Sequence, residues 1–267
     1  MPPSGSVTTS ATELPIRVVG RGDPILLVSG SGSGPDSWTP VAQALAGEFE
    51  VWSFVRRAYV GTHRSTAPRT FAAEVDDMRG ILDAIGRHAH VVGASLGATL
   101  ALHTARSSEA GIRSLALFEP PLLLAGPHVG DVVVRHRALV DAEQYRDAEL
   151  LVAREVLQAP GWLIEMIAQA PEEPDRDEAE REARGWSSDL AQLADDDRDV
   201  SRWSGLRAPT VLLAGGRTWS PVPEGVEALA AALPHAERVT WPEESHFVTA
   251  TAPDLVARAV ADFARRH

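Results

Sequence analysis

Hydrophobic and polar positions divide the chain into short apolar runs and longer stretches with helical periodicity. Between Phe71 and Ile85, apolar residues recur at steps of three and four, and Thr70 precedes them as a cap, which predicts a helix over about 71–86. Further helices are expected at about 38–47, 96–107 and 252–266. Seven apolar runs are short enough to be strands: residues 16–20, 24–30, 51–55, 89–93, 114–118, 209–215 and 237–241. This alternation predicts an α/β fold, a mostly parallel central sheet flanked by helices.

The ends of this pattern and its middle need separate interpretations. Residues 1–13 carry neither the basic region nor the apolar region of a signal peptide, and we expect them to form a frayed tail. The runs 16–20 and 24–30 are joined by a Gly-Arg-Gly-Asp turn and are expected to form an antiparallel pair. Residues 128–200 show only helical patterns. We therefore predict an α/β core of residues 1–120 and 206–267, interrupted by a helical insertion at 121–205.

Composition excludes several kinds of chemistry. The chain has 267 residues, of which 44% are hydrophobic and none is cysteine, so disulfides, thiolate metal sites and a cysteine nucleophile are excluded. All 25 basic residues are arginine, which excludes a catalytic lysine. The net charge of −12 argues against a nucleic-acid partner, and no run of about 18 apolar residues exists that could cross a membrane. We expect a cytoplasmic protein without a metal, in which the acidic run 172–182 is the solvated face of a helix.

The segment 91–98, Val-Val-Gly-Ala-Ser-Leu-Gly-Ala, is the strongest chemical signal in the sequence. Its residues Gly93 to Gly97 fit the pattern Gly-x-Ser-x-Gly, with a predicted strand before it and a predicted helix after it. This is the context of a nucleophile elbow, a tight turn in which small residues let strand and helix approach closely. Ser95 is therefore the candidate nucleophile, and a plain tight turn is the alternative.

With these features in order, the sequence resembles the α/β-hydrolase family over essentially its whole length. The resemblance implies a cofactor-independent serine hydrolase, with a base just before the last helix. His246, in the segment Pro-Glu-Glu-Ser-His-Phe, occupies that position. A serine hydroxyl needs such a base to remove its proton. Six other histidines have no comparable position (His88, His90, His103, His128, His136 and His235), and the role of His63, in a loop that could border the pocket, stays open.

The acid that orients the histidine departs from the usual family pattern. Most members keep it after the next-to-last strand, where this chain has residues 215–223 without Asp or Glu. Glu119, at the end of the run 114–118, is the natural substitute, as in zearalenone-type lactonases, which this arrangement resembles. Glu243 and Glu244 are alternatives, although side chains so close to His246 in one loop rarely reach its ring nitrogen. A broken triad is the remaining possibility.

The oxyanion hole is expected to use two backbone N–H groups. One is that of Leu96, directly after the nucleophile, and the other is that of Ser31, with Gly30 allowing the loop to bend. The family usually has His-Gly in this loop, where this chain has Ser29-Gly30-Ser31. The glycine-rich loop lacks the Gly-Lys-Ser/Thr ending of a phosphate-binding loop.

A second departure lies after the run 51–55. The family motif Asp-x-Arg-Gly-x-Gly-x-Ser has lost its Asp here, and only Gly61 and Ser65 keep its form. The pocket edge near Arg56, Arg57 and Tyr59 is therefore expected to be unusual. Arg57 could bind a carboxylate of the substrate, although a structural role is the more common one.

The resemblance implies that the helical insertion covers the pocket and selects the substrate. Its apolar residues include Trp162, Ile164, Met166, Ile167, Trp186 and Leu190. Together with Trp219, which stands where the acid usually is, Trp162, Met166 and Trp186 are expected to line an apolar pocket. We therefore expect hydrolysis of a carboxylic ester, lactone or thioester, with a bulky hydrophobic small molecule as the substrate. The protein could form a homodimer. Two alternatives remain open: a non-hydrolytic cyclase or lyase on the same fold, and a hydrolase-like receptor.

Overall fold

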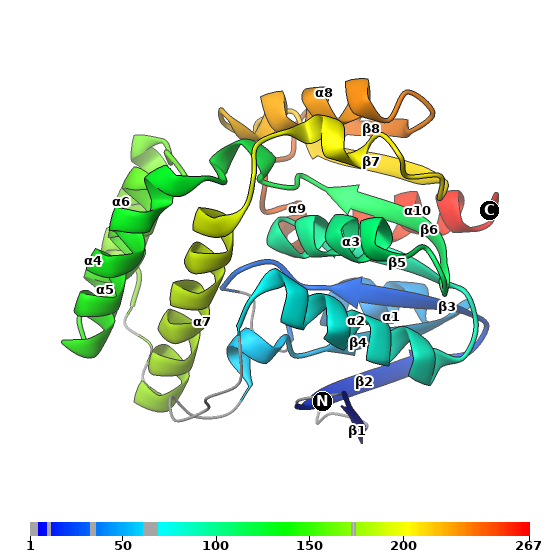
Figure 1. Ribbon diagram of the computed structural model, residues 1–267, viewed down its shortest axis with the longest axis horizontal. Helices are drawn as coiled ribbons and strands as arrows, with labels where there is room; N and C mark the ends of the chain where they lie inside the picture. Colours follow the sequence, from blue (N-terminus) through cyan, green and yellow to red (C-terminus); the bar gives the residue numbers. More distant parts are fainter. Residues whose placement is uncertain (1–4, 10–11, 33–35, 61–68, 172, 174) are drawn as a thin grey trace.

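Eight strands form one sheet in this computed structural model, which describes residues 5–9, 12–32, 36–60, 69–171, 173 and 175–267. The strand order across the sheet is β1-β2-β4-β3-β5-β6-β7-β8 (Figure 1). The β1–β2 and β2–β4 pairs are antiparallel and all other pairs are parallel. The expected mostly parallel sheet is therefore confirmed. The strands are β1 (Gly5–Thr8), β2 (Glu13–Gly20), β3 (Asp23–Val28), β4 (Phe49–Phe54), β5 (Ala89–Ala94), β6 (Ile112–Phe118), β7 (Thr210–Gly215) and β8 (Glu237–Trp241).

Two expectations for the start of the chain are wrong. Strands β2 and β3 do not pair with each other, because β4 lies between them, antiparallel to β2 and parallel to β3. Strand β3 is buried along residues 24–28, which requires a neighbouring strand on each side and helices on both faces. The segment expected to be a frayed tail contains β1, which pairs with β2 from Gly5 opposite Ile16 to Thr8 opposite Glu13. The edge of β2 offers backbone groups that this segment can pair with.

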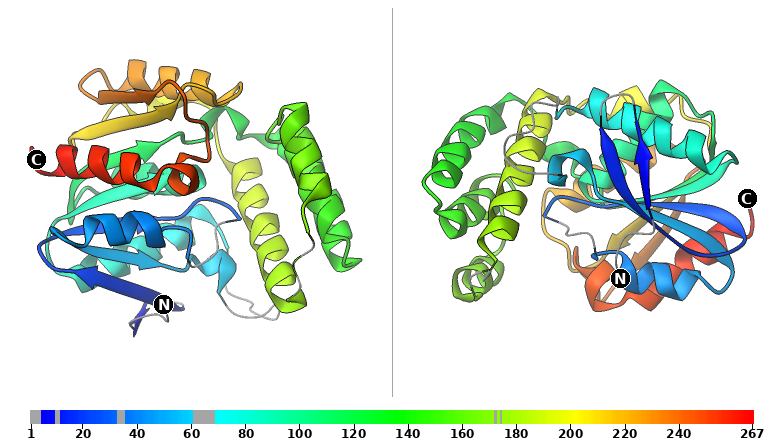
Figure 2. Two further views of the ribbon diagram at one scale, coloured as in Figure 1. Left: turned by 180° about the vertical axis from the view of Figure 1, so that it is seen from behind. Right: turned by 90° about the horizontal axis from the view of Figure 1, so that it is seen from below.

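Helices cover both faces of the sheet (Figure 2). On one face, α2, α3 and α8 pack against strand residues such as Leu26, Val91 and Leu115. On the other, α1 and α10 pack against Ile25, Val92 and Leu213. The predicted cap is confirmed, since Oγ1 of Thr70 accepts a hydrogen bond from the N–H of Ala73. The helices of the core are α1 (Thr39–Leu45), α2 (Phe71–Ile85), α3 (Leu96–Ser107), α8 (Val222–Ala232), α9 (Val248–Thr251) and α10 (Pro253–Ala264).

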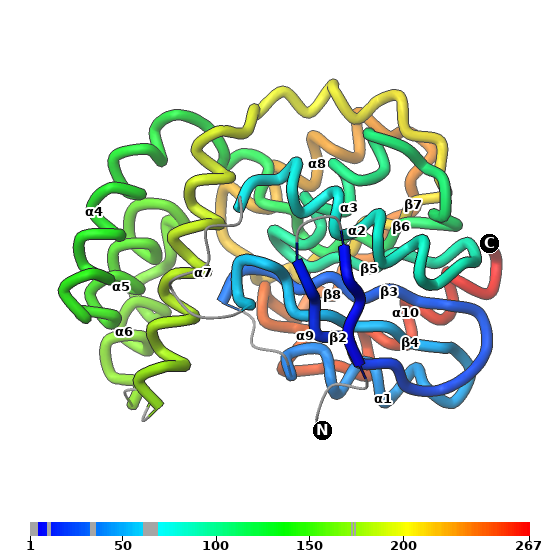
Figure 3. The backbone as a smooth tube through the Cα atoms, turned by 60° about the horizontal axis from the view of Figure 1, so that its bottom comes forward, coloured from blue at the N-terminus to red at the C-terminus, as the bar shows by residue number. Residues whose placement is uncertain are grey.

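Four α-helices of the described chain lie between β6 and β7, within the predicted insertion of residues 121–205. They are α4 (Gly130–Asp141), α5 (Tyr145–Glu155), α6 (Gly161–Gln169) and α7 (Arg176–Asp195). Figures 1 and 3 show them beyond the carboxyl ends of the parallel strands, with α7 between the core and the other three. Helix α7 therefore faces the loops that follow β3 and β4, and any site at this edge of the sheet lies beneath it.

Candidate active site

Ser95 occupies the tight turn between β5 and α3, as the sequence predicts. Its backbone angles are φ 53° and ψ −124°, a conformation that is strained for a residue with a side chain. A Cβ atom on Gly93 would lie 2.5 Å from the carbonyl oxygen of Gly97, and one on Gly97 would lie 2.3 Å from that of Val28. Only glycine therefore allows this approach of strand and helix. Leu96 begins α3, so its N–H belongs to the first turn, where no intrahelical acceptor is available.

Phe118 brings the other parts of the site to Ser95. It pairs with Ala94 in the β5–β6 register, and its carbonyl oxygen accepts a 2.8 Å hydrogen bond from the N–H of Ser95. The ring of His246 stacks on the ring of Phe118, with 5.7 Å between the ring centroids. Glu119 follows Phe118 directly. Ser95, His246 and Glu119 are thus all placed around the carboxyl ends of β5 and β6.

Glu119 and His246 form a short, largely buried hydrogen bond. Oε2 of Glu119 lies 2.6 Å from Nδ1 of His246, and the glutamate side chain is 1% exposed. The other carboxylate oxygen, Oε1, accepts hydrogen bonds from the backbone N–H of Gly215 and from Oγ1 of Thr218, both 2.7 Å long. These contacts fix the carboxylate and leave Nε2 of His246 for a second partner. Glu119 also has a positive φ of 45°, as Ser95 does.

The alternative acids lie elsewhere. Glu243 forms an ion pair with Arg217, and Glu244 accepts a hydrogen bond from Thr251. The loop that carries His246 packs closely on the end of β7, since a Cβ atom on Gly215 would lie 2.8 Å from Cα of Ser245. This packing places the loop beside β6, the neighbour of β7, where Glu119 emerges.

Three other histidines have structural partners. His90 and His136 are buried and lie within hydrogen-bond distance of Ser114 and Ser187, and burial lowers the pKa of each to about 4. His103 stacks on Phe71 and interacts with Asp196. His63, Gly61 and Ser65 lie outside the described residues, so the role of His63 stays open.

The loop of residues 29–32 that follows β3, here called the β3 loop, lies against the nucleophile. A Cβ atom on Gly30 would lie 3.0 Å from Cβ of Ser95 and 3.7 Å from its Oγ. Ser31, the expected second donor of the oxyanion hole, directly follows Gly30, the residue that lies against Ser95. The N–H of Gly32 donates a 2.8 Å hydrogen bond to the hydroxyl of Tyr59.

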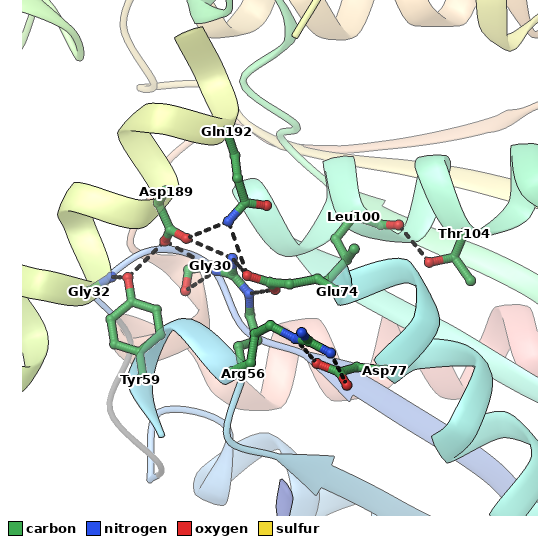
Figure 4. A network of polar contacts seen from close by, with 11 residues as sticks. Gly30, Gly32, Arg56, Tyr59, Glu74, Asp77, Leu100, Thr104, Asp189 and Gln192 are labelled. Carbon is green, nitrogen blue, oxygen red and sulfur yellow. Dashed lines mark hydrogen bonds and ion pairs between the residues drawn. The ribbon is translucent and has the colours of Figure 1, made fainter. Parts of the chain in front are cut away.

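A buried polar network joins the β3 loop to the insertion (Figure 4). It consists of Arg56, Tyr59, Glu74, Asp189 and Gln192, and we call it the Arg56 network. Arg56 forms ion pairs with Glu74 and with Asp189, both 2.7 Å long, and its side chain is fully buried. The two carboxylates hold the pKa of Arg56 well above its ordinary value, against the effect of burial. The sequence indicated an unusual pocket edge here but not this network, whose members come from three separate segments: the residues after β4, helix α2 and helix α7.

Arg57, beside the network, has an internal partner. Its guanidinium pairs with the carboxylate of Asp77 at 2.5 Å, and both side chains are buried. This carboxylate occupies the arginine, so the structural role considered for Arg57 fits the geometry better than a role in binding a substrate carboxylate.

The four side chains expected to line the pocket, three tryptophans and one methionine, lie in different surroundings. Trp219 lies beside His246, with 6.1 Å between ring centroids, and its Nε1 donates to the carbonyl oxygen of Leu157 in the insertion. Trp162 packs edge-to-face on Trp219 and is 53% exposed. Trp186 lies against the β3 loop, since a Cβ atom on Gly32 would be 2.5 Å from its Nε1. Met166 is 53% exposed on α6.

The insertion also contains a cavity of about 690 Å³ between α4, α5 and α7. Glu149, Glu173, Glu182 and Trp186 are among the residues that line it. Partial desolvation, reinforced by the neighbouring glutamates, raises the pKa of Glu182 to about 7. Within the acidic run 172–182 the described side chains are exposed or half-buried, as expected, and Glu182 is an exposed residue that also borders this cavity.

Two further properties of the described part of the chain bear on function. No cluster of three or more His, Asp or Glu side chains in it could hold a metal ion. None of its helices combines the length and apolar character needed to cross a membrane.

A mostly parallel sheet, a serine in the elbow after β5 and a histidine before the last helix define the architecture of an α/β hydrolase. The chain belongs to the alpha/beta hydrolase family, whose model matches residues 25–259. A relative from Azorhizobium caulinodans, named carbamate hydrolase RutD, is 30% identical over 263 residues, which cover 94% of each chain. A protein of the same name from Pantoea ananatis is 27% identical and covers 91% of this chain and 88% of the relative.

Solved structures agree with this assignment. An alpha/beta hydrolase from Sphaerobacter thermophilus is similar with a TM-score of 0.82 and 29% identity, covering 97% of this chain and 99% of that one. The enol-lactonase from Burkholderia xenovorans has a TM-score of 0.74 at 22% identity, covering 97% and 99% of the two chains. The second likeness shows a common fold.

Proposed function

We propose that the protein is a serine hydrolase that cleaves a carboxylic ester, lactone or thioester of a bulky hydrophobic compound through an acyl-enzyme. The observation that carries this proposal is the 2.6 Å contact between Glu119 and Nδ1 of His246, at the edge of the sheet where Ser95 occupies its elbow. A histidine oriented by a buried carboxylate is the base that a serine nucleophile requires.

In this mechanism Ser95 Oγ attacks the carbonyl carbon while Nε2 of His246 takes its proton. Glu119 keeps the imidazole oriented and stabilises the imidazolium that forms. The N–H groups of Leu96 and Ser31 stabilise the negative charge of the tetrahedral intermediate. His246 then returns the proton to the leaving group, and in the second half of the reaction it activates the water that cleaves the acyl-enzyme.

The aromatic residues support a hydrophobic substrate. Trp219 packs beside His246, Trp162 packs on Trp219, and Trp186 lies beside the β3 loop. These rings flank the proposed reaction centre on the side of the insertion. No metal or organic cofactor takes part in the proposed steps.

Carbamates are a second candidate substrate class. The relative of 30% identity over nearly the whole chain is named a carbamate hydrolase. In this case the same serine would attack the carbamate carbonyl, and an amine or alcohol would leave. The cyclase, lyase and receptor alternatives are less favoured, because they do not require the aligned histidine and glutamate.

The test is covalent labelling with a fluorophosphonate, followed by intact-mass measurement. The wild type is expected to gain one adduct, Ser95→Ala none, and Ser204→Ala, which changes a serine exposed near Trp203, the same adduct as the wild type. Hydrolysis of matched p-nitrophenyl esters and carbamates would then separate the two substrate classes. A folded wild type that is neither labelled nor active would overturn the acyl-enzyme mechanism.

A further inference from the structure

The peptide groups on both sides of Ser31 are held by side chains of the Arg56 network (Figure 4). On one side, Nη1 of Arg56 donates a long hydrogen bond of 3.4 Å to the carbonyl oxygen of Gly30. On the other, the N–H of Gly32 donates to the hydroxyl of Tyr59 at 2.8 Å. The first contact fixes the peptide group that contains the N–H of Ser31. The second fixes the peptide group that contains the carbonyl of Ser31.

The geometry of the peptide bond makes these contacts directional. In a trans peptide the carbonyl of one residue and the N–H of the next point in opposite directions. Because Arg56 holds the carbonyl oxygen of Gly30, the N–H of Ser31 points away from Arg56. The N–H of Gly32 is already donated to Tyr59, so we take that of Ser31 as the oxyanion donor of this turn.

One carboxylate of the insertion holds both of these side chains. Oδ1 of Asp189 accepts a 2.7 Å hydrogen bond from Nη2 of Arg56, and Oδ2 accepts one of 2.7 Å from the hydroxyl of Tyr59. Asp189 belongs to α7, whereas Arg56 and Tyr59 follow β4 of the core. The position of α7 is therefore transmitted to the β3 loop by the hydrogen bonds that Arg56 and Tyr59 form with Asp189 and with the loop.

The charges of this network are not arranged for stability alone. The Arg56 guanidinium contacts the carboxylates of Glu74 and Asp189, and all three side chains are at most 2% exposed. Buried ion pairs commonly stabilise a fold no better than apolar side chains of similar size, while they fix geometry well. Burial and Asp189 raise the pKa of Tyr59 well above its ordinary value, so its hydroxyl keeps the proton that it donates to Asp189.

We propose that Tyr59 and Asp189 are positioning residues for the oxyanion hole, through which helix α7 of the insertion holds the β3 loop in its reactive geometry. The proposal rests on the hydrolase function proposed above. It makes the insertion part of the catalytic geometry as well as a cover for the pocket. A displaced α7 would release Tyr59 and Arg56, and with them the orientation of the Ser31 N–H.

The experiment compares Tyr59→Phe and Asp189→Asn with the wild type, using Tyr145→Phe as the matched control. Tyr145 is the other tyrosine of the chain and lies on α5, away from the β3 loop. Four quantities are measured: kcat and KM on a p-nitrophenyl ester, the melting temperature, and amide hydrogen exchange in residues 29–32. Because an oxyanion donor acts on the transition state, Tyr59→Phe is expected to lower kcat by about 10–100-fold with KM within about twofold.

Hydrogen exchange in the β3 loop is expected to speed up by about tenfold in both variants, since the Gly32 N–H loses its fixed acceptor. Asp189→Asn should lower kcat at least as much as Tyr59→Phe, and the double variant less than the product of the two effects, because both act through the same loop. Tyr145→Phe should change none of the four quantities.

Unchanged kcat and unchanged loop exchange in Tyr59→Phe would overturn the proposal, as would a rise in KM without a fall in kcat. A wild type without any turnover would instead overturn the proposed function. In that case loop exchange would still decide the structural half, because equal exchange in all variants would show that Tyr59 and Asp189 do not hold the β3 loop.

Discussion

Oε2 of Glu119 lies 2.6 Å from Nδ1 of His246, although 127 positions separate the two residues in the sequence. Glu119 follows β6, whereas the family usually places this acid after β7. The two positions are equivalent in space because β6 and β7 are adjacent parallel strands, with Phe118 opposite Leu213. The N–H of Gly215, at the end of β7, donates to the same carboxylate. A carboxylate placed one strand away can thus still reach the ring nitrogen of the histidine.

Replacing Glu119 by Gln is expected to lower kcat by about 10³–10⁴-fold, since the amide cannot stabilise the imidazolium and can hold the wrong tautomer. Steady-state kinetics on a p-nitrophenyl ester measures this loss. Glu243→Gln is the matched control, because Glu243 is an exposed glutamate near His246 in sequence that pairs with Arg217. A Glu119→Gln enzyme that kept more than roughly a tenth of the wild-type kcat would show that Glu119 is not the triad acid.

Replacing Gly30 by Ala tests the contact between the β3 loop and the nucleophile. The added Cβ would lie 3.0 Å from both the carbonyl oxygen of Ala94 and Cβ of Ser95, so one of them must shift by a few tenths of an ångström. Such a shift is expected to lower kcat by about 10–100-fold with little change in the melting temperature. Gly47→Ala is the control, since its Cβ would have no atom within 4 Å. Equal kinetics in both variants would mean that the loop can yield without affecting the reaction.

Much of the fold and the three candidate catalytic residues could be predicted from local signals. Helix α2 is marked by its periodicity and by Thr70, and Ser95 by glycines that a strand-to-helix turn requires. The pairing of β2 with β4 could not be predicted, because a short turn after β2 makes β3 look like its partner. Pairing depends instead on how many neighbours a strand buried on both faces needs.

The Arg56 network could not be predicted from the sequence either, for a different reason. Along the chain, Arg56 is 18 positions from Glu74 and 133 positions from Asp189. Nothing local distinguishes them from the other charged residues, most of which are exposed. Glu74 and Asp77 do lie three positions apart on the face of α2 that is buried, and a pair of acids on a buried face is a usable signal for a buried cation.

His90 and His136 are expected to make the fold sensitive to acid. Each has a folded pKa of about 4 because of burial, below its ordinary value of 6.5. Below pH 6.5 the unfolded chain binds protons that the folded chain does not, so the free energy of unfolding falls as the pH decreases toward 4. Each histidine contributes at most about 3 kcal/mol of this loss.

Urea unfolding of His136→Gln between pH 4 and 8 checks this expectation. The variant should lose less stability than the wild type between pH 6.5 and 4, whatever its stability at pH 8. His88→Gln, which replaces an exposed histidine, should follow the wild-type curve. Parallel curves for His136→Gln and the wild type would show that the buried imidazole takes up its proton as readily in the folded state.

Glu182 is expected to act in the opposite direction. Partial desolvation beside the cavity of the insertion, together with the neighbouring glutamates, raises its pKa from 4.5 to about 7, so the folded state holds a proton that the unfolded state has already released. The free energy of unfolding therefore falls as the pH rises from about 4.5 to 7, by about 1–3 kcal/mol after allowance for partial exposure.

Glu182→Gln removes the charge and keeps the shape of the side chain. It should be more stable than the wild type at pH 8 by about that amount and lose this advantage near pH 4. Glu165→Gln, on the exposed face of α6, should show no pH-dependent gain. A Glu182→Gln variant whose difference from the wild type did not change with pH would mean that the carboxylate is ionised in the folded state at neutral pH, with a cation or water supplying the solvation that burial removes.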